Sequence, residues 1–215
     1  MKNKKWIAIM WALAVIPAIL TLLFWDRLPE QIPNRWSFNG VVSYGGKGNL
    51  WLMAALGPGM AALFQFLPRL DPKKENYKNF MGYYNAFAIV MEAFILVMVG
   101  IILVETFRPG TLRVGKVVMV LLSLLFLGMG SVMGKVKPNW FMGIRTPWAL
   151  SDPDVWNKTH RLGGWVFFLV GLINIPVALL CPEKVCAAIF FTALMAGCVL
   201  TYVMSYRWYK LKNRE

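Results

Sequence analysis

The single histidine, His160, lies in a long polar and aromatic connection, residues 135–162. An imidazole can serve as a general base or as a metal ligand near neutral pH. No cysteine or carboxylate set stands at ligand spacing around it, and no nucleophile with an orienting group accompanies it. A hydrogen-bonded structural histidine is therefore favoured, and we expect no metal, no cofactor and no catalytic residue.

The first half of this connection contains residues typical of turns and helix starts. Pro138-Asn139 favours a turn, and Gly143 allows a backbone conformation that other residues resist. Thr146-Pro147 resembles a helix cap followed by proline at the first helical position. The sequence therefore predicts a structured connection, not a simple link between two helices.

The second half predicts a short helix of its own. Ser151 to Asp154 resembles a capping box that opens a helix over Asp152–Leu162. Side chains four residues apart share a helix face, which pairs Trp156 with His160 and Asn157 with Arg161.

Two interpretations of this connection remain open. It can be an interfacial segment that places three tryptophans at the depth of the lipid headgroups and binds lipid phosphates through its basic residues. It can instead be a surface that recognises a partner. The tryptophans are Trp140, Trp148 and Trp156, and the basic residues are Lys135, Lys137, Arg145, Lys158 and Arg161.

A carboxylate, Glu92, interrupts the otherwise apolar stretch Met81–Val104; 13 uncharged residues (Asn79–Met91) precede it and 12 (Ala93–Val104) follow it. An ionised, unpaired carboxylate is costly in the middle of a membrane span, so Glu92 should face the interior of a helix bundle. It can be a proton- or cation-responsive site. It can also be protonated and hydrogen-bonded to Asn85 on nearly the same helix face, to Asn174 or to a backbone carbonyl.

The elements that hold these residues follow from composition. The 215 residues are 58% hydrophobic and only 15% charged, too apolar for a soluble domain of this length. Crossing a bilayer takes about 20 mostly apolar residues as helix. Six stretches qualify, and they predict an all-α, polytopic transmembrane helix bundle that forms a single membrane domain, residues 1–215. They are Trp6–Trp25, which we expect to be retained and not cleaved, Leu50–Leu67, Met81–Val104, Val117–Gly134, Gly163–Leu180 and Val185–Tyr206.

The orientation follows from the lysines and arginines. Sixteen lie in the two terminal tails and in the connections 68–80 and 135–162, against seven in the other three connections. The side richer in basic residues is normally cytoplasmic. We therefore expect both termini and the connection 135–162 in the cytoplasm, and residues 26–49 outside as a loop module. The net charge of +13 comes from short runs that flank apolar stretches, so we expect no direct nucleic-acid binding.

The three cysteines do not form a disulfide framework. Cys181 and Cys186 flank a very short turn, where two buried thiols are favoured over a disulfide on the outer face. Cys198 lies inside an apolar run and indicates packing.

Two motifs carry a resemblance to a known family. The run Lys137-Pro-Asn-Trp-Phe-Met-Gly-Ile-Arg-Thr-Pro-Trp148, then Val155-Trp-Asn-Lys-Thr-His-Arg161 and Gly163-Gly164, resembles the signature of the SdpI family. The outer connection resembles the N-terminal domain of unknown function found in that family. Its matching residues are Leu28, Pro29, Pro33, Trp36, Asn39, Gly40 and Lys47. It departs from the usual pattern at Arg35, where histidine is common, and at Ser43, where an acidic residue is common.

The resemblance implies a bacterial immunity protein of the cytoplasmic membrane, which protects the cell against a secreted, membrane-active peptide toxin. It also implies, for some members, that the toxin-bound protein holds a transcriptional repressor at the membrane. The partners expected are thus the lipid bilayer, a peptide toxin and a cytoplasmic repressor. The signature residues expected to matter are Pro138, Asn139, Gly143, Arg145, Thr146, Pro147, Trp148, Trp156, Thr159, His160 and Arg161.

Two other functions remain open from the residues alone. The first is a small proton-coupled transporter centred on Glu92. The second is a membrane enzyme that acts on lipid-linked substrates at the connection 135–162. In that enzyme Arg145, His160 and Arg161 would grip a phosphate, and Asp152 and Asp154 would be the available carboxylates.

Overall fold

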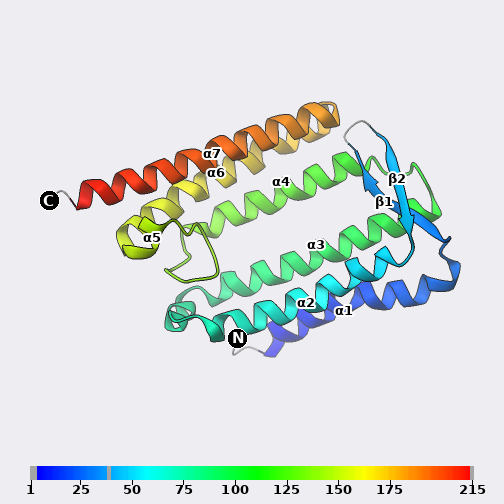
Figure 1. The fold of residues 1–215 in the computed structure, drawn as a ribbon, viewed down its shortest axis with the longest axis horizontal. Helices are drawn as coiled ribbons and strands as arrows, with labels where there is room; N and C mark the ends of the chain where they lie inside the picture. Colours follow the sequence, from blue (N-terminus) through cyan, green and yellow to red (C-terminus); the bar gives the residue numbers. More distant parts are fainter. Residues whose placement is uncertain (1–3, 38–39, 214–215) are drawn as a thin grey trace. The chain divides into compact units, whose positions relative to one another are not determined.

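The computed structural model describes residues 4–37 and 40–213. Six helices in these residues are long and apolar enough to cross a membrane, which confirms the predicted all-α, six-span fold. They are α1 (Lys4–Phe24), α2 (Asn49–Leu70), α3 (Met81–Phe107), α4 (Val114–Met133), α6 (Pro153–Leu180) and α7 (Glu183–Lys212) (Figure 1). The shorter elements are the 3-10 turns Trp25–Arg27 and Lys74–Asn79 and the five-residue helix α5 (Pro147–Ser151).

The fifth span begins ten residues before the predicted Gly163. The predicted separate helix Asp152–Leu162 is wrong, because α6 runs unbroken from Pro153 to Leu180. Gly163 and Gly164 do not break it. A Cβ on Gly163 would lie 2.1 Å from Ile144 Cδ1, and one on Gly164 would lie 3.0 Å from the Gly130 carbonyl oxygen. The two glycines therefore provide room for close packing on one face of a continuous helix.

The chain divides into two compact units, one from the described residues of Met1–Phe66 with Asn85–Val118, the other from those of Leu67–Tyr84 with Met119–Glu215. The single membrane domain expected from the sequence stays a prediction.

The first unit packs α1 closely against α2. The buried residues of α1 recur every three or four positions, as a helix with one packed face requires: Met10, Ala14, Pro17 and Thr21. A Cβ on Gly57 of α2 would lie only 2.6 Å from the Ala14 carbonyl oxygen. The absence of a side chain at Gly57 thus allows the two backbones to meet.

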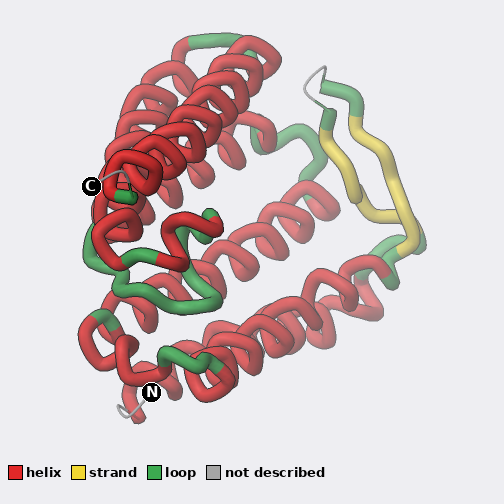
Figure 2. Tube along the Cα trace, turned by 60° about the vertical axis from the view of Figure 1, so that its left-hand side comes forward, coloured by secondary structure: helices red, strands yellow, loops and turns green. Residues whose placement is uncertain are grey.

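A β-hairpin follows α1, and the sequence patterns did not predict it. Strand β1 (Gln31–Trp36) pairs antiparallel with β2 (Val42–Gly46), and the register shifts between Pro33 and Arg35. Figure 2 shows this hairpin as the two yellow strands. The strands are short, and β1 contains a proline, so their pattern does not alternate clearly. The hairpin closes over an apolar cluster shared with α2 and α3: Leu28, Ile32, Leu50, Val99, Ile102 and Leu103.

The second unit contains α4 from Met119 onward, α6 and α7. The helices α6 and α7 run side by side, as Figures 1 and 2 both show. Phe126 of α4 meets Phe190 of α7 edge to face, with ring centroids 5.3 Å apart. A Cβ on Gly171 of α6 would lie 2.4 Å from the Ser123 carbonyl oxygen, so α6 also approaches α4 closely.

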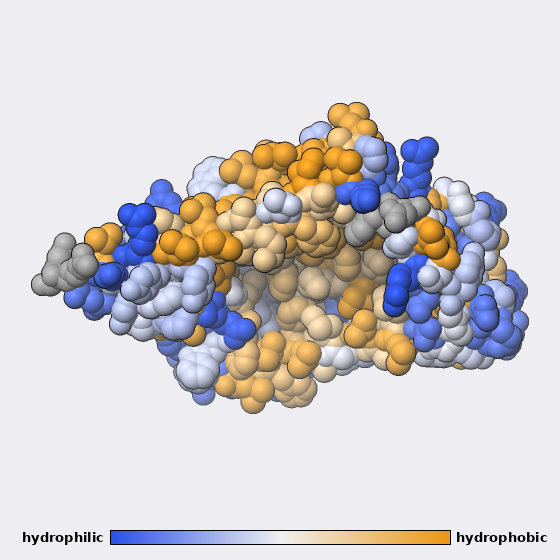
Figure 3. Space-filling view, turned by 45° about the horizontal axis from the view of Figure 1, so that its top comes forward, coloured by the Kyte–Doolittle hydropathy of each residue, from blue (hydrophilic) through white to orange (hydrophobic). Residues whose placement is uncertain are grey.

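Apolar side chains lie on the surfaces of these helices, as expected of lipid-facing spans. Figure 3 shows hydrophobic residues over the helix middles and hydrophilic residues gathered toward the helix ends. Membrane helices expose apolar side chains because lipid tails are as apolar as a protein core.

Candidate functional site

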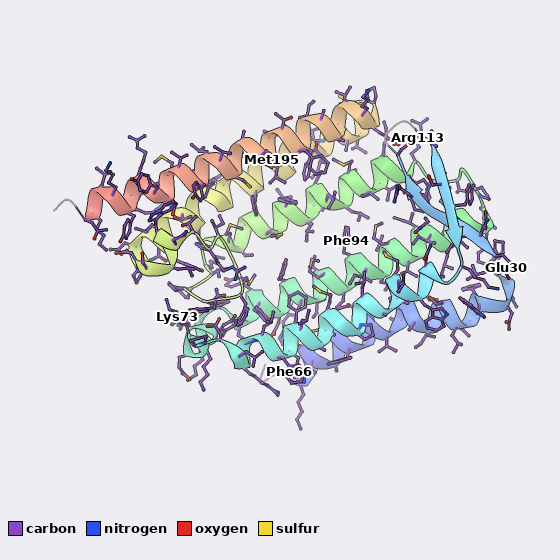
Figure 4. The ribbon with its side chains drawn as sticks, in the orientation of Figure 1. Glu30, Phe66, Lys73, Phe94, Arg113 and Met195 are labelled. Carbon is purple, nitrogen blue, oxygen red and sulfur yellow. The ribbon has the colours of Figure 1, made fainter. Side chains whose placement is uncertain are left out.

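The signature loop, defined here as residues 135–162, is bonded to the connection between α2 and α3 through one buried carboxylate. Asp71 is 2% exposed. Its Oδ1 accepts the backbone N–H of Lys73 at 2.7 Å, and its Oδ2 accepts the backbone N–H of Trp140 at 2.8 Å. The Tyr77 hydroxyl donates to the same Oδ2 at 3.1 Å. Figure 4 labels Lys73 at this connection. Three donors thus offset the cost of burying the charge.

Burial, together with the neighbouring Asp71 charge and hydrogen bond, raises the pKa of Tyr77 above its ordinary value. The phenol therefore stays protonated and remains a donor. A second bond joins the same segments, because Asn76 Nδ2 donates to the Pro138 carbonyl at 2.7 Å.

The predicted turn at Pro138-Asn139 is organised by the Asn139 side chain, which is fully buried. Its Nδ2 donates to the carbonyls of Lys137 and Met142, each at 2.9 Å. Its Oδ1 accepts the backbone N–H of Phe141 at 2.9 Å and that of Met142 at 2.6 Å. One side chain therefore satisfies four backbone groups of its own turn.

His160 fixes the middle of the loop against α6. Its Nδ1 lies 2.9 Å from the Trp156 carbonyl oxygen, and its Nε2 lies 3.0 Å from the backbone N–H of Ile144. A carbonyl only accepts and an amide N–H only donates, so the proton belongs on Nδ1 and Nε2 is the acceptor. Both ring nitrogens are engaged within the loop, which agrees with the structural role favoured from the sequence.

Gly143 and Trp156 complete the surroundings of this imidazole. Gly143 has a φ of +106°, and a Cβ there would lie 2.1 Å from His160 Nε2. The Trp156 ring stacks on the imidazole with centroids 3.9 Å apart, and its Nε1 donates to the Val136 carbonyl at 2.9 Å. The Trp156 side chain is fully buried and packs inside the protein, so it does not present its ring to lipid headgroups as the interfacial interpretation requires.

The predicted cap at Thr146-Pro147 is confirmed. Thr146 Oγ1 accepts the backbone N–H of Ala149 at 3.1 Å, and Pro147 is the first residue of α5. The Thr146 hydroxyl also lies 2.6 Å from Ser205 Oγ on α7. Trp148 contacts Tyr202 and Tyr206 of α7, each at 5.0 Å between ring centroids. Helix α5 is thus attached to α7.

The predicted capping box at Ser151 is wrong, because Asp152 caps α6. Its Oδ1 accepts the backbone N–H of Asp154 at 2.7 Å and that of Val155 at 3.0 Å. Lys212 Nζ lies 2.8 Å from Asp152 Oδ2 and 2.6 Å from Asp154 Oδ2. The hydrogen bond from Lys212, followed by that from Val155, lowers the pKa of Asp152 below its ordinary value.

The remaining signature residues differ in exposure. Arg145 is exposed and donates to the Trp140 carbonyl. Arg161 is exposed, and no described residue forms a hydrogen bond or ion pair with its guanidinium. Thr159 is fully buried, and its hydroxyl has no hydrogen-bond partner among the described residues.

The loop module predicted over residues 26–49 contains the hairpin. Lys47 Nζ forms an ion pair with Glu30 at 3.0 Å and lies 5.0 Å from the centroid of the Trp25 ring. Figure 4 labels Glu30 at this end of the first unit. Pro33 is buried in β1, and Pro29 precedes that strand in an exposed position.

Of three further residues predicted for the outer loop, the structure describes Trp36 and Gly40. Trp36 packs against the Leu28–Ile32 cluster, and its indole N–H has no partner among the described residues. Gly40 has a φ of +79° in the turn. Asn39 lies outside the described residues.

The intramembrane polar residues lie in two different units. Glu92 is fully buried in α3, and neither carboxylate oxygen has a hydrogen-bond partner among the described residues. Asn85 Oδ1, also on α3, likewise lacks one. Of the three partners considered for a protonated Glu92, namely Asn85, Asn174 and a backbone carbonyl, none is hydrogen-bonded to it among the described residues.

Asn174, in the other unit, has partners of its own. It donates to Ser123 Oγ at 2.8 Å and accepts from the Cys186 thiol at 3.5 Å. None of the three cysteines forms a disulfide. Cys186 is buried, as predicted, whereas Cys181 is only partly buried and Cys198, expected to pack, is exposed.

The sequence patterns did not point to Asp71, Asn76 and Tyr77, which hold the loop in place. They lie 62 to 69 residues before their partners in the chain. An aspartate directly after an apolar span was the available signal, but such residues usually face solvent.

Across the described residues, no three His, Cys, Asp or Glu side chains gather where they could hold a metal ion.

The fold and the site together define a multi-pass helical membrane protein with a folded, internally bonded connection between α4 and α6. Residues 135–206 match the SdpI/YfhL protein family, and residues 12–57 match the Domain of unknown function (DUF1648). The chain is 22% identical over 198 residues to the Immunity protein SdpI of Bacillus subtilis (strain 168), and the match covers 91% of each chain. No solved structure matches.

These matches confirm the resemblance inferred from the two motifs. The chain carries an SdpI/YfhL family region and an N-terminal DUF1648 region, and it is a multi-pass protein of the bacterial cell membrane.

Proposed function

We propose that this protein is a non-enzymatic immunity protein that protects the cell against a secreted, membrane-active peptide. The observation that carries the proposal is the match to an immunity protein over 91% of both chains, with the six spans in place. The structure of the signature loop supports a role without catalysis. His160, Asp71 and Asp152, the groups best suited to acid–base chemistry, are each engaged by two or more internal partners.

The proposal places both termini and the signature loop in the cytoplasm and the hairpin outside. Sixteen of the lysines and arginines then lie inside. The hairpin is the proposed contact for the peptide, because it exposes Val41 (63%) and Tyr44 (56%) next to its turn and on β2. A two-stranded sheet also has two free edges, to which an extended peptide can add as a strand.

The signature loop is then the rigid inner end of the protein. Asn139, His160 and Asp71 bond it to itself and to the connection between α2 and α3, so the loop has little freedom of its own. We propose that this fixed surface, with exposed Arg145, is where a cytoplasmic repressor is held when the peptide is bound.

The contact with the peptide can be tested on the hairpin. Val41→Ser removes an exposed apolar side chain from it, and Val185→Ser removes one from the start of α7, on the same predicted side of the membrane. With both variants at wild-type membrane levels, the proposal expects Val41→Ser alone to lower survival under a panel of secreted, membrane-active bacterial peptides. Equal survival of the two variants would contradict a role for the hairpin.

A second candidate function, a small proton-coupled transporter, is favoured by Glu92. A fully buried carboxylate without a hydrogen-bond partner among the described residues is unusual in a membrane helix and often functional. Glu92→Gln keeps the shape and removes the titration. If the protein is a transporter, this variant should insert normally into the membrane but lose all transport. If it protects the cell by binding the peptide, protection should persist in the variant.

A further inference from the structure

A pocket in the second unit lies between the end of α4 and the first half of α6. Its volume is about 410 Å³. Glycines from both helices form part of the wall: Gly130 and Gly134 from the α4 side, and Gly164 from α6. A Cβ on Gly130 would lie 2.6 Å from the Gly164 carbonyl oxygen, so the helices touch there through their backbones. Larger side chains at these positions would separate the helices and fill the pocket.

Two cations line this pocket. Lys135 follows the end of α4, and its ammonium lies 4.8 Å from the centroid of the Tyr83 ring, which holds it in place. Arg161 enters from α6, and its Cα lies 4.0 Å from where a Cβ on Gly134 would be. The Arg161 guanidinium has no ion pair among the described residues, so its charge is available to a ligand. The pocket therefore suits an anion.

The depth of the pocket follows from the length of α6. Its 28 residues extend about 42 Å, whereas the apolar core of a bilayer needs only about 20 residues. Twenty residues counted back from Leu180 end at Arg161. The two cations thus lie where the apolar core ends and the headgroups begin. Trp165, one turn deeper on the same face, occupies the depth that tryptophan prefers.

The same face of α6 continues into the membrane with exposed apolar side chains. Trp165 is 60% exposed, and Leu169 and Leu172 are each 46% exposed. From Arg161 these positions are four, eight and eleven residues along the helix, so they form one stripe. This order on the protein, from charge through indole to aliphatic surface, matches the order of polarity along a phospholipid, from phosphate to acyl chain.

We propose that this pocket binds the phosphate of an anionic phospholipid, with one acyl chain along Trp165, Leu169 and Leu172. Arg161 and Lys135 contact the phosphate oxygens. The lipid ties the first half of α6 to the end of α4 through two residues of the signature loop. No residue of this site belongs to the hairpin proposed to contact the peptide.

The test uses the full chain in a non-ionic detergent and native mass spectrometry to count bound lipid. The probes are short-chain phosphatidylglycerol, short-chain phosphatidylcholine and inorganic phosphate. The double variant Lys135→Gln/Arg161→Gln removes both cations of the pocket. The control Lys137→Gln/Lys158→Gln removes two cations of the same loop that do not line it.

The proposal expects the pocket variant to bind phosphatidylglycerol about tenfold more weakly than the wild type, while the control binds normally. Ser131 is an exposed residue of the pocket wall. Ser131→Leu keeps both charges but fills the pocket, so it should also weaken the binding of phosphatidylglycerol. Equal loss in the pocket and control variants would overturn the proposal, since binding would then depend only on general charge. Displacement of the lipid by inorganic phosphate alone would equally overturn it.

Discussion

Gly143 and His160 fit together as one unit: the imidazole Nε2 occupies the space in which a Cβ on Gly143 would lie, 2.1 Å away. The same nitrogen accepts the N–H of Ile144, the next residue. The absence of a side chain at position 143 is thus what lets the imidazole reach the loop backbone.

Gly143→Ala should destabilise the protein by a few kcal/mol. The added Cβ meets the imidazole, and alanine resists a φ of +106°, which by itself costs about 1–3 kcal/mol. Thermal unfolding in detergent measures the effect. Gly110→Ala is the matched control, because Gly110 has a φ of +77° and no atom lies within 4 Å of the place its Cβ would take. Equal losses of stability in the two variants would show that the contact with His160 does not add to the cost of the positive φ.

His160→Phe should cost about 1–3 kcal/mol, because it leaves the partly buried Ile144 N–H without its acceptor. The aromatic stacking on Trp156 is preserved in this variant, so the loss reports the hydrogen bonds. An unchanged unfolding midpoint would contradict the structural role of the imidazole.

Asp71→Asn should destabilise the docking of the signature loop by about 1.5–3 kcal/mol. In the wild type, the carboxylate accepts hydrogen bonds from the backbone N–H groups of Lys73 and Trp140 and from the Tyr77 hydroxyl. In the variant, the amide NH2 group would face some of these donors and could not accept from them. Protease cleavage within residues 135–146 of the folded protein should accelerate. Asp26→Asn, at an exposed aspartate, is the control. The same cleavage rate in both variants would argue against the Asp71 contacts.

The contact of α7 with the start of α6 should depend on pH. The pKa of Asp152 is lowered in the folded protein, so its contribution to stability is present above its ordinary pKa of 3.8 and is lost as the pH falls below that value. The stability difference between wild type and Asp152→Asn should therefore shrink in acid. Unfolding midpoints of both proteins between pH 7 and pH 3 measure it; a constant difference would contradict the ion pair.

Gly57→Ala should disrupt the packing of α1 on α2, since its Cβ would lie 2.6 Å from the Ala14 carbonyl oxygen. The expected loss is about 1–3 kcal/mol, as for overpacked cores. Gly59→Ala, two residues along the same helix with open space around its Cβ, should have little effect. Similar unfolding midpoints for the two variants would rule out the close approach.

The parts of the fold predictable from the sequence were those set by local pattern. The six apolar stretches gave six spans, and the Thr146-Pro147 dipeptide gave the start of α5, because length, hydropathy and capping act within a few residues. The hairpin was missed because its strands are short and interrupted by Pro33.

Other parts depend on contacts that sequence spacing does not reveal. The helix Asp152–Leu162 and the span from Gly163 were predicted as two elements, yet Gly163 and Gly164 pack on Ile144 and Gly130 inside one helix, α6. Trp156 suggested a membrane interface, yet it is buried against His160 and Val136. Asp71 became a site residue only through Trp140, 69 positions later.

Protection against a secreted peptide is tested most directly by the survival of toxin-treated cells. A bacterial strain sensitive to secreted, membrane-active peptides expresses either the full chain or an empty vector, and viable cells are counted after exposure. We predict that the full chain raises survival at least tenfold for at least one peptide of the panel. Killing equal to that of the empty vector for every peptide, with the protein present in the membrane at normal levels, would contradict the proposed function.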